Sequence, residues 1–137
     1  AMLSQGGAKI IIDGSLQGYT GYLSQPYYVQ QGSDPMYRGN ARGTKAHFIE
    51  MMKELHGAGW QLYVHANGDA ASDIYLDGLK EIQATNPRPD MRSVAIHAQV
   101  LRQDQLEDMA ELDVIPSFFN LHTYYWSDLH NDKVLGP

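Results

Sequence analysis

Short apolar runs and longer amphipathic segments alternate along the chain. An apolar run of four to eight residues bounded by turn signals is typical of a buried strand, and apolar residues at helical spacing predict a helix. The runs that predict strands lie at residues 8–13, 60–66, 92–98 and 113–118. The segments that predict helices lie at residues 44–57, 70–84 and 102–111. The chain therefore reads as a strand, a long interruption, and then alternating helices and strands.

This order of elements predicts an α/β fold. Alternating strands and helices form parallel sheets through right-handed crossover connections. Four such units could make a small open sheet or half of an eight-stranded barrel, and the pattern alone leaves both open. A length of 137 residues is normal for one domain with a real core, so we treat residues 1–137 as a single unit.

Two segments lack both periodicities. Residues 14–43 are rich in glycine, proline and tyrosine, and a loop of this length is usually functional. Its tyrosines could form the wall of a substrate pocket, or the loop could be a surface excursion that packs its own aromatic rings. Residues 119–137 form an aromatic and polar tail, which we expect to be irregular.

Two histidines stand at equivalent places. His65 and His97 each close an apolar strand, and each is followed by alanine. The carboxyl ends of neighbouring parallel strands meet at one edge of a sheet, so both imidazoles would lie close enough to share an ion such as zinc. A histidine in a strand is more often a buried structural residue, but the repetition favours a metal site.

Charged residues near the first strand also require an explanation. By strand alternation Lys9 and Asp13 share one face, where an unpaired buried charge would be costly. The simplest explanations are a contact between the two side chains, or a lysine that reaches solvent at the strand mouth. Asp69 follows the second strand and is expected to cap the next helix, because its carboxylate can accept from exposed backbone N–H groups.

Composition excludes several classes of function. The formal net charge is −6 and no run of lysine or arginine occurs, which disfavours nucleic acid or an anionic membrane as a partner. Cysteine is absent, so there is no disulfide framework and no thiol nucleophile. We find no signal peptide and no apolar run near the length of a membrane span, and we expect a cytoplasmic protein.

Five short motifs occur together in one order: Lys9–Ser15, Gln25–Tyr27, His65–Ala70, Ile96–Gln99 and His122–Asp128. In this combination the chain resembles the amidohydrolase superfamily. It is most similar to the amidohydrolase family 3 branch of metal-dependent hydrolases related to N-substituted formamide deformylase.

The resemblance implies a (β/α)8 barrel with one or two divalent metals, zinc first, at the carboxyl ends of the strands. Iron, manganese or nickel would also suit such ligands. Lys9 matches the fourth-strand lysine, which is carboxylated in many members. His65 and His97 match the metal-binding histidines of the fifth and sixth strands, so the resemblance implies that these three residues are the catalytic and metal-binding set. It also implies that Tyr27, His122 and Trp126 contact substrate.

Two parts of the family pattern have no counterpart here. The first-strand His-x-His pair and the eighth-strand aspartate cannot be placed, and Asp128 lies in the wrong motif to be that aspartate. The resemblance therefore implies strands four to seven, a half barrel that belongs to an enzyme hydrolysing an amide or formamide C–N bond with metal-activated water.

We do not expect the isolated chain to turn over substrate, and we expect it to form homo-oligomers through exposed strand edges. The alternative is a non-catalytic α/β module that binds a small molecule or associates with itself.

Overall fold

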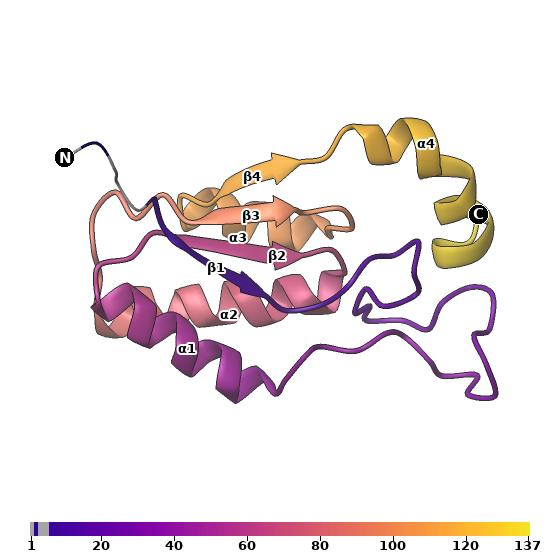
Figure 1. Cartoon of the computed structure of the whole chain (residues 1–137), viewed down its shortest axis with the longest axis horizontal. Coiled ribbons are helices and arrows are strands. Elements are labelled where there is room, and N and C mark those ends of the chain that lie inside the picture. The colour runs from indigo at the N-terminus through magenta and orange to yellow at the C-terminus, as the bar shows by residue number, and fades with distance from the viewer. Residues whose placement is uncertain (1, 3–5) are drawn as a thin grey trace.

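The computed structural model describes residues 2 and 6–137. Four parallel strands form one sheet in the order β1-β2-β3-β4 (Figure 1). The strands are β1 (Ala8–Ile11), β2 (Leu62–Ala66), β3 (Val94–His97) and β4 (Ile115–Phe118). The helices between them are α1 (Lys45–Gly57), α2 (Asp69–Thr85) and α3 (Gln103–Glu111).

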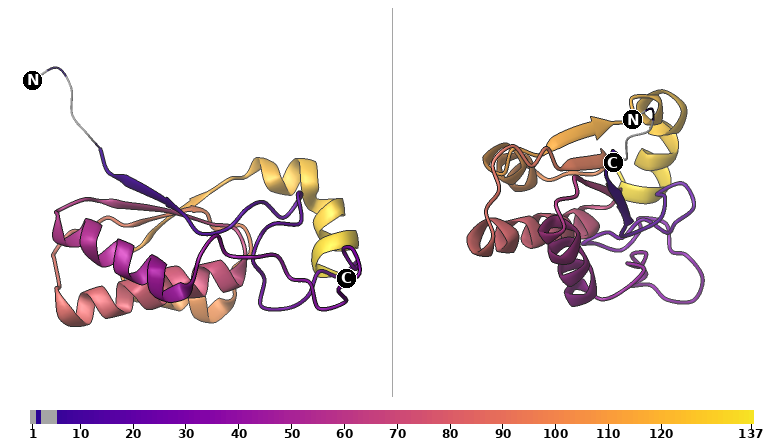
Figure 2. Two further views of the ribbon diagram at one scale, coloured as in Figure 1. Left: turned by 60° about the horizontal axis from the view of Figure 1, so that its bottom comes forward. Right: turned by 60° about the vertical axis from the view of Figure 1, so that its left-hand side comes forward.

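The predicted α/β fold is confirmed, and the arrangement of the helices distinguishes the open sheet from the half barrel. The three helices lie on the same side of the sheet (Figure 2). A doubly wound open sheet carries helices on both faces, whereas a barrel carries them only outside. The sequential strand order and the single helical layer therefore identify a segment of a TIM-type barrel.

The side of the sheet that faces the helices holds the main core. In β2, Leu62, Val64 and Ala66 are buried and alternate with half-buried Tyr63 and His65. The three apolar side chains pack in one cluster with residues of α1 and α2. Burial of each large aliphatic side chain contributes roughly 1.5–3 kcal/mol, so this layer is the main source of stability.

The opposite side of the sheet, which we call the open face, is much less covered. The strand register places Ile11 beside His65 and Lys9 beside Tyr63 on this face. Ile115 of β4 lies on the same side, and Ile11 and Ile115 are 41% and 47% exposed. In a closed barrel this face is the interior, filled by side chains from all strands.

The observed strands are shorter than the predicted runs, and β1 ends at Ile11. Asp13 is therefore not on the strand face of Lys9, as alternation had suggested. Lys9 is exposed on the open face, whereas Asp13 is fully buried among backbone groups. Of the two simple explanations for Lys9, the structure favours the lysine that reaches solvent.

The expectation of an irregular tail was wrong. Residues 121–135 form helix α4 (Leu121–Leu129) and a π-helical turn, η1 (His130–Leu135). No residue of α4 is buried. A helix without a buried face needs no apolar stripe, so the 3.6-residue signal that reveals amphipathic helices is missing from this sequence.

Residues 14–43 contain no helix or strand, and they fold around their own aromatic core. Tyr27 stacks against Tyr37 and meets Tyr19 edge to face, with ring centroids 6.0 and 5.3 Å apart. This second cluster also encloses Val134 of η1. Of the two interpretations of the loop, the structure favours self-packing, and the packed loop holds the end of the chain in place.

Asp13 joins this loop to the sheet. Its carboxylate is 0% exposed and accepts hydrogen bonds from the backbone N–H groups of Tyr22, Asn67 and Gly68, at 2.9, 3.0 and 2.9 Å. Tyr22 belongs to the loop, and Asn67 and Gly68 form the turn between β2 and α2. One buried side chain therefore connects three segments.

Gly68 lies where two backbones approach each other. A Cβ atom there would overlap the backbone carbonyl of Tyr22, whose oxygen also accepts from the N–H of Ala71 at 3.3 Å. The φ angle of Gly68 is −84°, which any residue adopts, so the requirement for glycine is steric.

The prediction that Asp69 caps α2 was wrong. The N-cap is Gly68, and Asp69 is the first residue of the helix. Its carboxylate instead accepts from the backbone N–H and hydroxyl of Ser24 and from Arg102, the latter at 3.1 Å. A carboxylate in the first turn also suits the helix dipole. Asp69 thus fastens the loop to α2 and to the start of α3.

Within the described residues, no helix combines the length and apolar character needed to cross a membrane.

We predict that Gly68→Ala destabilises the chain by about 1–3 kcal/mol, because the added methyl group must displace the Tyr22 backbone. Urea unfolding followed by circular dichroism measures the change. Gly57→Ala is the matched control, since nothing lies within 4 Å of the added Cβ. A midpoint for Gly68→Ala equal to that of Gly57→Ala would contradict the close approach.

We also predict that Asp13→Asn lowers the free energy of unfolding by about 1–3 kcal/mol. The amide cannot accept at both positions, so at least one buried N–H group loses its partner. Thermal melting of this variant should be compared with that of Asp128→Asn, which changes an exposed carboxylate of α4. Equal melting temperatures for the two variants would count against the role assigned to Asp13.

Candidate functional site

The carboxyl ends of the strands lie together, beside the loop and α4 (Figure 1). His65 is the last residue but one of β2, and His97 is the last residue of β3. Their ring centroids are 4.7 Å apart and their planes are inclined by 83°. The structure therefore brings the two histidines together, as their positions at successive strand ends suggested.

The backbone at the end of β3 is unusual. The register pairs His97 with Ala66, which faces the helices, so regular alternation would turn His97 away from His65. However, His97 and Ala98 have φ angles of +75° and +45°, in the left-handed region that residues other than glycine rarely adopt. This departure ends the strand, and the imidazole lies beside His65. Such strain costs about 1–3 kcal/mol per residue and is often found at functional sites.

His65 is held by polar groups that surround its Nε2 atom. Its Nε2 lies 3.1 Å from the carbonyl oxygen of Gly14 and 3.4 Å from a carboxylate oxygen of Asp13. The side-chain amide nitrogen of Asn67 also lies 3.1 Å from Nε2, so these three contacts fix the orientation of the ring. Metal-ligating histidines are usually oriented in this way, with one nitrogen bound to an oxygen and the other free to ligate.

Burial favours the neutral imidazole at His97 and at His122. It lowers the pKa of His97, and repulsion from Lys9 and from protonated forms of His65 and His122 lowers it further. Burial likewise lowers the pKa of His122. A neutral ring keeps the lone pair that a metal or a hydrogen-bond donor requires.

The carboxyl group of Asp13 is subject to opposing effects. Burial raises its pKa, while the three backbone N–H groups and His65 act to lower it. Three backbone N–H groups donate to this carboxyl group and His65 lies next to it, so it is satisfied within the protein.

The residues that sequence suggested as metal ligands form an incomplete set. In the described part of the chain, no three histidine, aspartate or glutamate side chains converge on a point that could hold an ion. Lys9 lies on the same face as His65, one strand away and two residues earlier in the register. The arrangement supplies two adjacent imidazoles and an exposed lysine amine.

The three residues expected to contact substrate lie in different places. His122 is beside the histidine pair, with its ring centroid 6.1 Å from that of His97. Tyr27 is buried in the aromatic cluster of the loop, and its hydroxyl donates to the carbonyl of Gly21 at 2.8 Å. Trp126 lies on the exposed helix α4 and is 40% exposed. Only His122 adjoins the candidate site.

A pocket of about 270 Å³ opens between the ends of β3 and β4 and the start of α4. Residues 97–99, 118–120, 122 and 123 line it. Gln99 extends from it to His130, with the amide nitrogen 2.9 Å from Nε2 of that ring. Gln99 and His130 were not predicted as site residues. The position of Gln99, two residues after His97, could have indicated a site residue. His130 lies in a tail without periodicity, and the sequence gives no such indication there.

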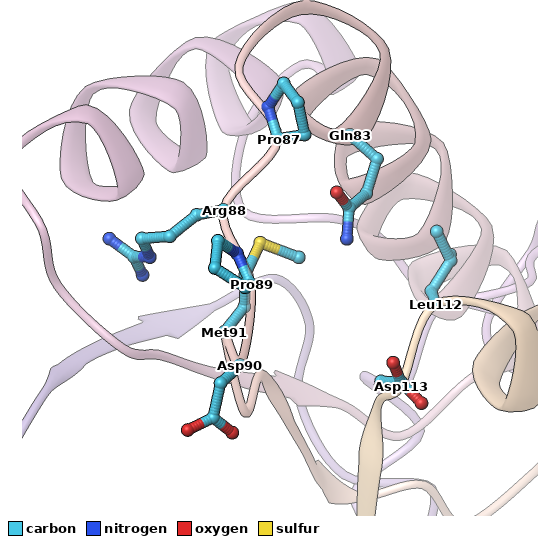
Figure 3. A pocket seen from close by; sticks show the side chains of 8 residues that line it. All are labelled: Gln83, Pro87, Arg88, Pro89, Asp90, Met91, Leu112 and Asp113. Atoms are coloured by element: carbon cyan, nitrogen blue, oxygen red, sulfur yellow. The ribbon is translucent and has the colours of Figure 1, made fainter.

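A larger cavity of about 440 Å³ lies at the other end of the sheet, between Gln83, residues 87–91 and residues 112–113 (Figure 3). These segments precede β3 and β4. Arg88 is already engaged there, since it donates to the carbonyl oxygens of His56 and Trp60 at 3.0 and 2.8 Å. In βα barrels the chemistry lies at the carboxyl ends and the amino ends contribute to stability. We therefore assign this cavity no catalytic part.

Two curated proteins are similar in sequence to this chain. The protein named "Putative amidohydrolase YtcJ" of Bacillus subtilis (strain 168) is 32% identical over 121 residues, which is 82% of this chain and 21% of that protein. Protein LONG AFTER FAR-RED 3 of Arabidopsis thaliana is 30% identical over 112 residues, 82% of this chain and 18% of that protein. The chain thus spans about a fifth of the length of these relatives.

Two solved structures share the fold. An uncharacterized metal-dependent hydrolase from Pyrococcus furiosus superposes with a TM-score of 0.76 at 30% identity, over 93% of this chain and 25% of the other. An uncharacterized metal-dependent hydrolase from Pyrococcus horikoshii OT3 gives a TM-score of 0.77 at 28% identity, over 95% and 24% of the two chains.

The family comparison agrees with the arrangement of strand-end histidines on a barrel segment. The model of the amidohydrolase family matches residues 1–137, the whole length of this sequence. The chain belongs to the amidohydrolase family.

Proposed function

We propose that this chain forms part of a metal-dependent hydrolase that cleaves a C–N bond in a small amide or formamide. The observation that carries the proposal is the pair of imidazoles at the strand ends, 4.7 Å apart, with His65 oriented by Gly14 and Asp13. The family and the named hydrolases with this fold support the reaction class.

The residues present fit a divalent metal in part. His65 and His97 each have, when neutral, one ring nitrogen with a lone pair that can ligate an ion. Zinc is the ion we favour, because imidazole nitrogen suits it well, and iron, manganese or nickel would also be accepted. Lys9, if carboxylated in the complete protein, would add carbamate oxygens on the same face.

Each residue of the candidate site would then have a separate role. A divalent metal bound there would lower the pKa of a water molecule and polarise the scissile carbonyl. His65 and His97 would hold the ion, and Gly14 and Asp13 would keep the His65 ring in its orientation.

Other ligands must come from outside this set. Two imidazoles and an unmodified lysine leave a catalytic zinc short of the three protein ligands it usually has, and the chain spans only about a fifth of its curated relatives. Strands contributed by a longer protein would supply the remainder. In this proposal the complete protein is the enzyme, a cytoplasmic one, and the isolated chain is inactive.

A specific observation also supports self-association of the isolated chain. The open face exposes Ile11 and Ile115, and strands β1 and β4 are the two edges of the sheet. Unpaired edges and exposed apolar side chains are sites where chains pair. A second copy could therefore cover this face when no other barrel strands are present.

We predict that the isolated chain binds zinc through the two strand-end histidines. Elemental analysis after incubation with zinc and desalting should show bound metal in the parent chain. His65→Ala and His97→Ala should each weaken binding by roughly 10–100-fold or more, since even supporting residues have effects of this size. His47→Ala, an exposed histidine of α1, should retain the metal. Equal metal content in all four proteins would refute the proposed pair.

We further predict that the isolated chain is oligomeric and that Ile11→Lys with Ile115→Lys shifts it toward monomer. Charges on the open face would oppose burial of that face against a second copy. Size-exclusion chromatography with light scattering measures the mass. The control is Met36→Lys, which alters an exposed apolar residue of the loop. A monomeric parent chain would exclude self-association.

A further inference from the structure

Asn67 lies in the turn between β2 and α2, two residues after His65, and is 3% exposed. Its amide nitrogen donates to the carbonyl oxygen of Gly14 at 2.6 Å and lies 3.1 Å from Nε2 of His65. Gly14 follows the end of β1, and His65 lies near the end of β2. One buried amide therefore contacts residues at the ends of two neighbouring strands.

The carbonyl oxygen of Gly14 determines which way the Asn67 amide points. If the amide were turned around, its oxygen would face that carbonyl oxygen, and two acceptors cannot form a hydrogen bond. The nitrogen is therefore the atom that lies against both Gly14 and His65. The carbonyl of Gly14 also contacts Nε2 of His65, at 3.1 Å, so the amide, the carbonyl and the ring form one contact group.

The backbone of Asn67 reaches the next strand end. Its carbonyl oxygen accepts from the N–H of Val100 at 3.0 Å, and its own N–H donates to Asp13 at 3.0 Å. Val100 is three residues after His97, just beyond the left-handed backbone of His97 and Ala98. The segment that carries His97 is thus fastened to the residue whose side chain contacts His65.

The side chain of Asn67 makes its protein contacts through the nitrogen alone. In the part of the chain that the structure describes, its Oδ1 atom is buried and has no hydrogen-bond partner. An apolar side chain of similar shape would therefore lose only the contacts to Gly14 and His65. The backbone hydrogen bonds to Asp13 and Val100 do not depend on the side chain.

A shared metal ion makes strict demands on the two rings. Each ligating imidazole must place a nitrogen about 2.0–2.1 Å from a zinc ion. Ligating groups must be held within about 0.5 Å of the productive geometry by the residues that contact them. Since His65 and His97 belong to different strands, a residue that contacts both segments can fix the distance between their rings.

We propose that Asn67 is a positioning residue that fixes the mutual arrangement of the His65 and His97 rings. Its side chain restrains His65, and its backbone restrains the segment after His97. The rings consequently meet with centroids 4.7 Å apart and planes inclined by 83°. The inference rests on the proposed function for its bearing on metal binding, but the ring arrangement itself requires no metal.

The test begins with NMR spectroscopy of the metal-free 137-residue chain at constant pH. Nuclear Overhauser contacts between the ring protons of His65 and His97 should be present in the parent chain. In Asn67→Leu these contacts should be lost while the chain stays folded, because the amide is removed and the backbone hydrogen bonds remain. Asn86→Leu is the matched control, since it makes the same replacement at an exposed position after α2.

Zinc titration of the same proteins provides the second measurement. Asn67→Leu should bind zinc about 10–100-fold more weakly than the parent chain, as found for residues that orient metal ligands. Asn86→Leu should bind zinc as the parent does. A role in stability alone would lower the melting temperature of Asn67→Leu and change neither the ring contacts nor the zinc affinity.

Unchanged ring contacts, or unchanged zinc affinity, in a folded Asn67→Leu would overturn the proposal. Asn67→Ala removes the amide without adding larger apolar groups, and it replaces Asn67→Leu if that variant does not fold. Loss of folding in both variants would show that Asn67 serves the whole fold, which would also overturn the narrower role. A parent chain that binds no zinc would refute the metal pair, while the metal-free ring contacts would still test Asn67.

Discussion

The buried carboxylate of Asp13 is the contact on which the strand-end architecture depends. It accepts from the backbone of Tyr22, Asn67 and Gly68 and lies 3.4 Å from Nε2 of His65. Charge-assisted hydrogen bonds are stronger than neutral ones, and a buried carboxylate is tolerated only when it is fully satisfied. The loop, the turn after β2 and the imidazole are consequently positioned by one group. The same group supports the fold and helps to orient a candidate ligand.

Hydrogen bonds to buried carboxylates explain why residues 14–43 are well packed although they contain no helix or strand. The two anchors of this loop are carboxylates, because Asp13 binds Tyr22 and Asp69 binds Ser24. Between these anchors the tyrosines pack on one another and against Val134 of η1. The loop therefore carries the tail helices toward the strand ends, where His122 and His130 join the histidine pair. Residues distant in sequence meet at the site through this packing.

The fold could be predicted from sequence because its signals are local. The apolar strands and the helix over 44–57 have clear periodicity, and Thr44 accepts from the N–H of His47 as an N-cap does. The pairing of His65 with His97 followed from parallel topology. The tail helices were missed because a helix without a buried face has no apolar stripe. The part played by Gln99 depends on a contact with His130, a residue 31 positions away, and no pattern encodes that contact.

The strained end of β3 connects the fold to the proposed chemistry. Left-handed backbone at His97 and Ala98 is unfavourable for these residue types, and the two exposed isoleucines of the open face are unfavourable as well. Both costs are understandable if other strands of a barrel and a metal ion contribute favourable contacts on that side. Free energy lost at a site is commonly recovered when the site binds its ligand. The features that are least stable in this chain alone are therefore those that a completed metal-dependent hydrolase would use.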